Sequence, residues 1–331
     1  MKNSKKILLA IHHIPRLNLS FLPTPLHKLE NVSRLHDANI YCKRDDLTGF
    51  AFGGNKTRKL DFLIRDAITR GADCIVTYGS QQSNWCRITA AAGARYGLKV
   101  YLVLAGKENV IPTGNLLLDH LAGAEIHNMD SENDDVLAGE CMHLVDKLKT
   151  YGKNPYYLKV GGSTTLGTMA YVAAFVEIME YTEATGTVFD SIFVAAGSGG
   201  TQAGLVAGKM LCDWPGQIVG INVSRDEKEQ KELVKTILKG VFQYLGREVG
   251  DAALDQAVIT DDHYIGEGYG RKTEACTRAI SLFAGKEGIY LDEVYTGKAA
   301  AGMIDYIISR KTDGNKNILF VHTGGNIQLF Q

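Results

Sequence analysis

One lysine in the sequence lies where chemistry could use it. Lys56 follows the pair Gly53-Gly54 and precedes an apolar pattern over residues 60 to 68 that predicts an amphipathic helix. Asn55 is expected to cap this helix, so Lys56 falls in its first turn. The positive end of the helix dipole disfavours a cation there and lowers the pKa of the amine, which favours the neutral, nucleophilic form. A solvated surface lysine is the alternative, since most lysines are exposed.

A glycine-rich segment between an apolar strand and a predicted helix is a candidate anion site. It reads Gly197-Ser198-Gly199-Gly200-Thr201. Small residues let backbone N–H groups approach an anion, and the helix N-terminus supplies positive potential. A tight turn would also select glycine, but the strand-turn-helix context favours phosphate binding. Gln202 stands where a dinucleotide fingerprint needs its third glycine, and no Gly-Lys-Ser/Thr sequence occurs. A single terminal phosphate needs only this cradle.

Hydroxyl and amide groups occur in further loops. Gln82-Ser83-Asn84 opens a predicted helix and suits a carboxylate or a phenolic oxygen, although Asn84 could equally be the N-cap. Tyr269 and Tyr295 have glycine-rich surroundings and could transfer protons, but most tyrosines fill cores or interfaces. The histidines show no spacing typical of metal ligands, so no metal site is predicted.

The elements that must position these residues alternate along the chain. Residues 1–30 are expected to be irregular, and strands are predicted at 40–44, 74–78, 100–104, 125–128, 156–160, 191–196, 217–223 and 318–321. Helical patterns fall between them, which argues for parallel sheets with helices on both faces. Ligands bind at the carboxyl ends of such strands. Polar loops fall there at 79–84, 161–165, 197–201 and 323–325. We therefore expect one crevice between two interlocked α/β lobes.

Composition narrows the class of protein. The chain of 331 residues is long enough for two lobes, and Lys+Arg 36 against Asp+Glu 37 favours neither a nucleic acid nor an anionic membrane as partner. The six cysteines are dispersed, which suits a reducing compartment better than a disulfide scaffold. The apolar run after Lys5-Lys6 is too short for a signal peptide, and no stretch is long enough to span a bilayer. A cytoplasmic protein is expected.

Taken in order, the motifs resemble those of the D-cysteine desulfhydrase and 1-aminocyclopropane-1-carboxylate (ACC) deaminase family of fold-type II pyridoxal-phosphate enzymes. The motifs are residues 53–60, 82–84, 197–201, 267–270, 294–298 and 322–325, and the resemblance runs from about Leu22 to Phe330. It implies a tryptophan synthase β-like α/β fold of two interlocked parallel-sheet lobes. The large, cofactor-binding domain would comprise residues 1–51 and 162–331, and the small domain residues 52–161, with a substrate-carboxylate loop. A homodimer is also implied.

The resemblance gives roles to the matching positions. Lys56 would bind the cofactor, pyridoxal 5'-phosphate, covalently, and Asn84 would bond its phenolic oxygen. The segment Gly197 to Thr201 would hold the phosphate. Either Thr296 or Thr323 would face the pyridine nitrogen.

The substrate, a small amino acid, would meet a second group of residues. Gln82 and Ser83 would hold its carboxylate, with Asn84 and Trp85 beside them. Ser83, Tyr269 and Tyr295 are the expected catalytic partners of the lysine, the two tyrosines flanking the substrate.

Three positions bear on the reaction. ACC deaminases have glutamate where Thr296 stands and leucine where Thr323 stands, so both threonines resemble the desulfhydrase branch. Trp85 departs from that branch, which usually has histidine. The implied function is α,β-elimination, with D-cysteine converted to pyruvate, ammonia and hydrogen sulfide. L-Cysteate sulfo-lyase and ACC deaminase activities are the alternatives. A nicotinamide-dependent reductase using Arg225, or a non-catalytic binding protein, fits less well because Lys56 would then have no function.

Overall fold

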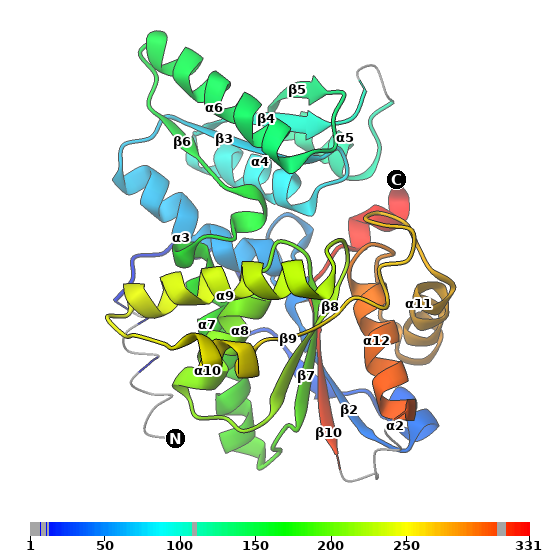
Figure 1. Cartoon of the computed structure of the whole chain (residues 1–331). Helices are drawn as coiled ribbons and strands as arrows, with labels where there is room; N and C mark the ends of the chain where they lie inside the picture. Colours follow the sequence, from blue (N-terminus) through cyan, green and yellow to red (C-terminus); the bar gives the residue numbers. More distant parts are fainter. Residues whose placement is uncertain (1–6, 8–10, 12, 108–110, 310–315) are drawn as a thin grey trace.

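Two β-sheets organise the chain (Figure 1). The computed structural model describes residues 7, 11, 13–107, 111–309 and 316–331, so the apolar run after Lys5-Lys6 lies mostly outside the described residues. The larger sheet has six strands, in the order β1 (Leu26–Lys28), β2 (Asn39–Arg44), β10 (Asn317–His322), β7 (Ser191–Ala196), β8 (Gln217–Asn222) and β9 (Ile259–Asp261). The smaller has four, in the order β5 (Glu125–Met129), β4 (Lys99–Ala105), β3 (Cys74–Ser80) and β6 (Pro155–Tyr157).

The strand pairings confirm the predicted α/β class. Among the described strands every pairing is parallel except that of β1 with β2. Central strands such as β3 and β7 are apolar and buried along their length, as expected when helices cover both faces of a parallel sheet. No helix among the described residues is long and apolar enough to cross a membrane.

Helices cover both faces of the larger sheet (Figure 1). One face packs against α7 (Thr165–Thr185), α8 (Gly200–Leu211), α9 (Glu227–Tyr244) and α10 (Asp251–Ala257). The other packs against α2 (Glu30–His36), α11 (Glu274–Glu287) and α12 (Thr296–Ser309). Each group buries a separate apolar cluster, which fixes the carboxyl ends of β7 and β10 relative to the helices that follow them.

The smaller sheet is covered in the same way. Its one face packs against α6 (Asp134–Thr150) and its other against α4 (Asn84–Tyr96) and α5 (Gly114–Leu121). The lysine helix α3 (Asn55–Thr69) lies between the lobes: Leu60 and Ile64 join the cluster of the smaller sheet, while Phe62 joins that of the larger. The division into residues 1–51 with 162–331 and residues 52–161 stays a prediction, because α3 packs on both lobes.

Several local expectations were wrong. Residues 1–30 are not all irregular, because β1 pairs with β2. The predicted strand at 156–160 ends at Tyr157, since a 3-10 turn begins at Val160. Asn55 is not the cap of α3: Gly54 precedes the helix without a side-chain cap, and the Asn55 amide donates to Thr201 Oγ1 at 2.9 Å. Asn55 therefore ties the lysine helix to the glycine-rich segment.

Candidate active site

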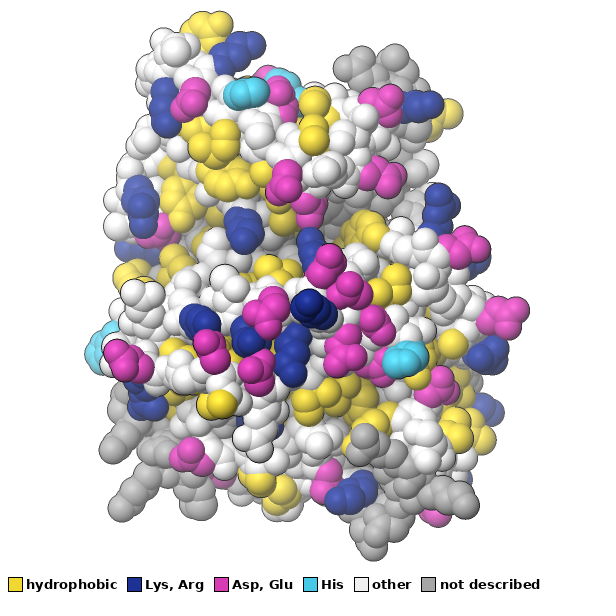
Figure 2. Space-filling model, viewed as in Figure 1, with side chains coloured by type: hydrophobic (Ala, Val, Ile, Leu, Met, Phe, Trp, Pro, Cys, Tyr) yellow, Lys and Arg dark blue, Asp and Glu magenta, His cyan; other side chains and the backbone are white. Residues whose placement is uncertain are grey.

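The loops at the carboxyl ends of both sheets line a single cavity of about 700 Å³. All four of the predicted polar loops contribute to it, which confirms the expected crevice: they supply Ser83, Gly161, Gly199 and Thr323 among others. On the face drawn in Figure 2, basic and acidic side chains are intermixed over the larger lobe and do not separate by sign.

Lys56 lies in this cavity, in the first turn of α3. Its Nζ donates to Asn55 Oδ1 at 3.3 Å, and burial lowers the pKa of the amine to about 8. The sequence argument relied on the helix dipole, whereas desolvation is the cause visible in the structure. A substantial fraction of the amine is therefore neutral near pH 8, which is the form that attacks a carbonyl carbon.

The glycine-rich segment forms an uncapped helix start in the cavity wall. Gly199 precedes α8 at φ 80° and has no side chain of its own to cap the helix. Gly197, Ser198 and Thr201 line the cavity beside it. A helix start without a capping side chain presents N–H donors and positive potential, so these residues fit a phosphate group. Gly200 does not line the cavity, since its N–H donates to Ser163 Oγ at 3.2 Å.

Lys59 and Ser163 support this segment; Ser163 lies in the predicted polar loop 161–165, whereas sequence reasoning gave Lys59 no role. Lys59 is fully buried and donates to Gly161 O at 3.0 Å and Ser163 Oγ at 3.4 Å. Burial first, and then the charge of Lys56, holds the pKa of Lys59 well below its usual value. A Cβ at position 200 would lie 2.7 Å from Ser163 Oγ and 3.0 Å from Lys59 Nζ, so only glycine fits there. The signal available in the sequence was a second lysine one helical turn after Lys56.

The side chains of the loop before α4 point in two directions, some into the cavity and one toward α5. Ser83, not Asn84, is the N-cap, because Ser83 Oγ accepts from Cys86 N at 3.2 Å. Ser83 and Asn84 line the cavity, as predicted, but Gln82 does not. The Gln82 side chain turns to the start of α5, where its Oε1 accepts from Asn115 N at 2.9 Å. The Gln82 side chain therefore points away from the cavity, and its expected role in holding a substrate carboxylate stays a prediction.

The predicted pair of tyrosines meets at the cavity. Tyr269 and Tyr295 both line it, and their hydroxyl groups are hydrogen-bonded to each other. Burial raises the pKa of Tyr295 well above its usual value, so this phenol keeps its proton over the physiological range. Tyr269 is 45% exposed and lies in the part of the lining that reaches solvent.

The two threonines expected near the cofactor differ in their placement. Thr323 lines the cavity. Thr296 is fully buried at the start of α12 and lies outside the cavity lining: its hydroxyl donates to Asp292 Oδ1 at 2.6 Å and accepts from Asp292 N at 2.9 Å. Asp292 takes this position because its carboxylate also accepts the N–H groups that open the helix. Thr296 is therefore not placed to face a pyridine nitrogen, and Thr323 remains the candidate.

Trp85 borders the cavity, but the indole belongs mainly to the core of the smaller lobe. It is 2% exposed, and its Nε1 donates to Thr77 Oγ1 at 2.8 Å. A Cβ at Gly162 would lie 2.9 Å from the indole ring, so the ring is packed closely against that turn. This agrees with the ordinary behaviour of tryptophan as a large core residue whose N–H finds a buried partner.

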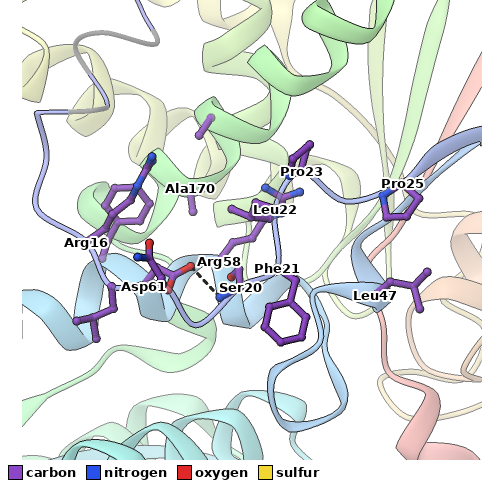
Figure 3. A pocket seen from close by; sticks show the side chains of 14 residues that line it. Arg16, Ser20, Phe21, Leu22, Pro23, Pro25, Leu47, Arg58, Asp61 and Ala170 are labelled. Atoms are coloured by element: carbon purple, nitrogen blue, oxygen red, sulfur yellow. Dashed lines mark hydrogen bonds between the residues drawn. The ribbon is translucent and has the colours of Figure 1, made fainter.

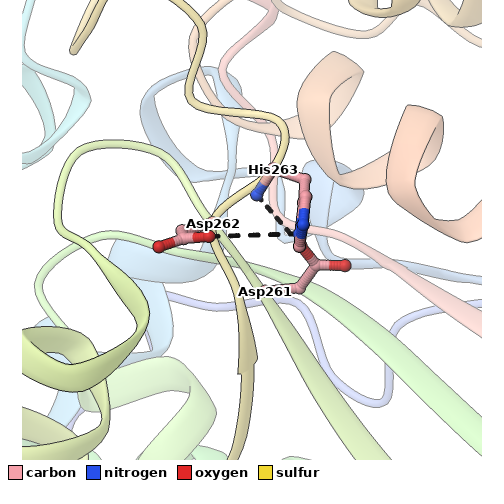
Figure 4. A group of neighbouring side chains, drawn as sticks. All are labelled: Asp261, Asp262 and His263. Atoms are coloured by element: carbon pink, nitrogen blue, oxygen red, sulfur yellow. Dashed lines mark hydrogen bonds and ion pairs between the residues drawn. The ribbon is translucent and has the colours of Figure 1, made fainter.

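Two other features of the surface are separate from this cavity. A second cavity, of about 720 Å³, lies beside α3, between Arg58 and Asp61 on that helix and the segment around Arg16 and Phe21 (Figure 3). Asp261, Asp262 and His263 form a small cluster after β9 (Figure 4). Asp261 is hydrogen-bonded to His263, and Asp262 accepts from Glu227 N at the start of α9, so the cluster stabilises this turn.

A lysine of lowered pKa beside an uncapped glycine-rich helix start, at the meeting edge of two parallel sheets, defines the class of fold-type II pyridoxal-phosphate enzymes. The chain belongs to the family of pyridoxal-phosphate dependent enzymes, which it matches over residues 17–324. Its cofactor is pyridoxal 5'-phosphate. This favours the predicted cofactor over a nicotinamide, and Arg225 has a different use here: it donates to Gly197 O and pairs with Asp134.

Relatives of known name cover nearly the full chain. D-cysteine desulfhydrase of Salmonella typhi is 39% identical over 330 residues, covering 97% of this chain and 98% of the relative. A Pyrococcus furiosus protein with the provisional name 1-aminocyclopropane-1-carboxylate deaminase is 38% identical over 320 residues, covering 97% and 94%. The crystal structure of an ACC deaminase homologue matches with a TM-score of 0.90 at 38% identity, covering 98% of this chain and 96% of that one. A fungal L-serine ammonia-lyase from Rhizomucor miehei matches with a TM-score of 0.67 at 17% identity, covering 93% and 94%, which supports the fold alone.

Proposed function

We propose that the protein is a carbon-sulfur lyase that performs α,β-elimination on a small amino acid, with D-cysteine as the substrate and pyruvate, ammonia and hydrogen sulfide as products. The observation that carries the proposal is the placement of Lys56 in one cavity with Ser83, Thr323 and the Tyr269–Tyr295 pair. Pyridoxal phosphate supplies an electron sink for the carbanion formed when the α-proton leaves.

The residues of the cavity would share the remaining work. Lys56 would bind the cofactor and move the α-proton, since its amine is partly neutral near pH 8. Ser83 and the N-terminus of α4 would hold the substrate carboxylate, and Asn84 would bond the phenolic oxygen of the cofactor. Tyr295 would keep a proton available to the leaving group, because its phenol stays neutral.

The choice of D-cysteine is supported by two observations of different weight. The desulfhydrase relative is 39% identical over almost the whole chain. Thr323 lines the cavity, and a hydroxyl beside the pyridine nitrogen would not keep that nitrogen protonated as a carboxylate would. Elimination needs less carbanion stabilisation than the opening of a cyclopropane ring. The argument from Thr296 no longer supports this choice, since its hydroxyl is bonded to Asp292.

Two alternatives remain on the same cavity. ACC deaminase activity is supported by the provisional name of the Pyrococcus furiosus relative. L-Cysteate sulfo-lyase activity differs only in its leaving group. Pyruvate release from D-cysteine, L-cysteine, β-chloro-D-alanine, D-serine and L-cysteate, and 2-oxobutyrate release from ACC, should be compared under one set of conditions. D-cysteine as the best substrate is the expected result. ACC as the best would overturn the elimination of a β-substituent, and L-cysteate would change only the leaving group.

The role of Lys56 has its own test. The purified protein should absorb visible light, and borohydride should fix the cofactor on the peptide that contains Lys56. Lys56→Ala should abolish both the visible band and turnover, whereas Lys153→Ala, at an exposed position, should change neither. A Lys56→Ala protein that keeps its band and full turnover would show that the assignment is wrong.

The assembly and location of the enzyme form the last part of the proposal. The family resemblance implies a homodimer, and the dispersed cysteines suit the cytoplasm. Phe21, Leu22 and Leu47 are 70%, 45% and 46% exposed beside the second cavity and offer an apolar surface for a second copy. Light scattering on the purified protein should give the mass of a dimer, and a monomer at micromolar concentration would contradict this part.

A further inference from the structure

Arg87 and Asp119 are buried charges behind the cavity that form no direct ion pair. Arg87 lies on α4, one helical turn after Asn84, and is 2% exposed. Asp119 lies on the neighbouring helix α5 and is fully buried. Among the described residues, Arg87 Nε and Nη1 and both carboxylate oxygens of Asp119 lack a hydrogen-bond partner. Buried donors without a partner on α4 thus lie near buried acceptors without a partner on α5. Buried polar groups of this kind are rare in folded proteins and need an explanation.

The remaining nitrogen of Arg87 connects two parts of the active site. Arg87 Nη2 donates to Gly53 O and to Asn84 Oδ1, at 3.4 Å each. Gly53 belongs to the turn that starts the lysine helix, and Asn84 lines the cavity. One guanidinium nitrogen therefore bridges the turn that places Lys56 and the amide of Asn84.

These contacts fix the orientation of the Asn84 amide. Asn84 Oδ1 accepts from Arg87 Nη2 and also from Asn115 Nδ2, at 3.1 Å. A guanidinium can only donate hydrogen bonds, so the amide must present its oxygen, and not its NH2 group, to Arg87. The Nδ2 atom of Asn84 is then left as a donor at the cavity wall, which suits an oxygen that carries negative charge.

Asp119 is the acidic group that acts on the guanidinium in this interior, and its effect is complete only above its raised pKa, where the carboxyl is ionised. Burial lowers the pKa of Arg87 to about 10, and the charge of Asp119 opposes the change. Burial raises the pKa of Asp119 to about 8, and the charge of Arg87 opposes that change. Each group opposes the pKa change that burial causes in the other, so removing Asp119 alone would leave Arg87 as an unpaired buried cation.

We propose that Arg87 is a positioning residue: it orients the Asn84 amide so that the NH2 group binds the anionic phenolic oxygen of the cofactor, and Asp119 keeps Arg87 in place. The inference rests on the proposed role of Asn84. It assigns to Arg87 no contact with substrate or cofactor, so the effect of Arg87 on cofactor binding must pass through Asn84.

The test measures the dissociation constant of pyridoxal phosphate from the apoprotein, together with the melting temperature of that apoprotein. Arg87→Met combined with Asp119→Leu removes both buried charges and leaves neither unpaired, so the melting temperature should change little. The dissociation constant should rise about tenfold, as expected for the loss of one charge-assisted contact. In an Asn84→Ala background the same pair of changes should alter it less than about twofold. Arg95→Met, an exposed position on the same helix, should leave it unchanged.

The outcomes separate the inference from the function on which it rests. If Asn84→Ala leaves cofactor affinity unchanged, the proposed role of Asn84 is wrong and the inference falls with it. If Asn84→Ala weakens binding but the Arg87/Asp119 change does not, or weakens it equally in both backgrounds, only the positioning role is overturned. Should the double variant fail to fold, Asn84→Asp is informative: it keeps an oxygen toward Arg87, so the apoprotein should be at least as stable while cofactor affinity falls. Retained affinity in Asn84→Asp would contradict the inference.

Discussion

Lys56 and Lys59 lie one helical turn apart on α3 but have different partners. Lys59 is enclosed, with its amine bonded to Gly161 O and Ser163 Oγ. Lys56 faces the cavity, and among the described residues its amine has only the Asn55 amide oxygen as an acceptor. At the scale of single residues, a polar side chain can serve the active site only if its hydrogen-bonding groups are not already used within the protein. The amine of Lys56 is available, whereas Gln82 and Thr296 are hydrogen-bonded to protein groups.

Cofactor uptake by the apoprotein should follow the titration of Lys56. The pKa of the amine is about 8 because burial penalises its charge, and only the neutral amine attacks the aldehyde. The rate of formation of the visible band should therefore rise up to about pH 8 and level off above it. A free lysine derivative, measured with pyridoxal phosphate in parallel, controls for the ionisations of the cofactor. A rate that climbs without a plateau through pH 10 would contradict a lowered pKa.

Helix α3 is held against α7 by a buried group of charges. Arg58 donates to Asp45 Oδ2 at 2.9 Å and to Glu177 Oε1 at 2.7 Å, and Tyr171 donates to Asp45. Burial by itself would raise the pKa of Asp45, but the charges of Arg58 and Lys43 outweigh it and the net change is a lowering. At the scale of elements, this network fixes the helix that carries Lys56 to the larger lobe.

Arg58→Met should therefore destabilise the protein strongly. The buried Asp45 and the partly buried Glu177 would lose the cation that bonds to both and keep only Lys43, and breaking a buried ion pair costs about 3–5 kcal/mol in comparable cases. Urea unfolding followed by far-ultraviolet circular dichroism would measure the loss. Arg65→Met, at an exposed position on the same helix, is the matched control and should change the free energy of unfolding by less than about 0.5 kcal/mol. Equal effects at the two positions would show that the network contributes nothing.

The start of α8 can be tested with a pair of glycines. Gly199 has φ 80°, and a Cβ there would lie 3.1 Å from Ile237 and 3.3 Å from Leu233 on α9. Gly97 has φ 69° with nothing within 4 Å of a Cβ. Alanine at either site should cost about 1–2 kcal/mol of stability from the backbone strain. Only Gly199→Ala should also weaken cofactor binding, by shifting the helix start away from α9; equal cofactor dissociation constants would refute the phosphate role of this segment.

The sequence predicted the elements that have continuous apolar runs. It did not predict helix starts and side-chain directions that depend on particular hydrogen bonds. β7 and the core of β10 were predicted because such runs identify buried parallel strands. α12 was missed because Thr296-Gly297 resembles a turn, although Asp292 accepts the N–H groups that open the helix. Gln82 and Ser83 were grouped by polarity, yet successive residues at a helix start project in different directions. The buried partners Lys59 and Arg87 could not be predicted, since burial of a charge depends on distant elements.

At the scale of the whole molecule, the cavity lies where two sheets meet and few contacts bridge its rim. Arg225, after β8, donates to Asp134 Oδ2 at 3.1 Å, at the start of α6 on the smaller lobe. The two side chains are 34% and 52% exposed, so this pair contributes little stability. The interface depends instead on α3, whose apolar residues join the clusters of both lobes.

The position of β10 has a consequence for the biosynthesis of the enzyme. This last strand lies in the middle of the larger sheet, between β2 and β7, while the smaller sheet is built from consecutive strands. During synthesis the smaller lobe can pair all its strands early, whereas β2 cannot pair with β10 until residues 317–322 have been made. Chains that end at residue 316 should therefore bind no cofactor, and a protease should digest the segments of the larger lobe before residues 74–157. Intact protection of both lobes in that truncated chain would contradict this order of strand pairing.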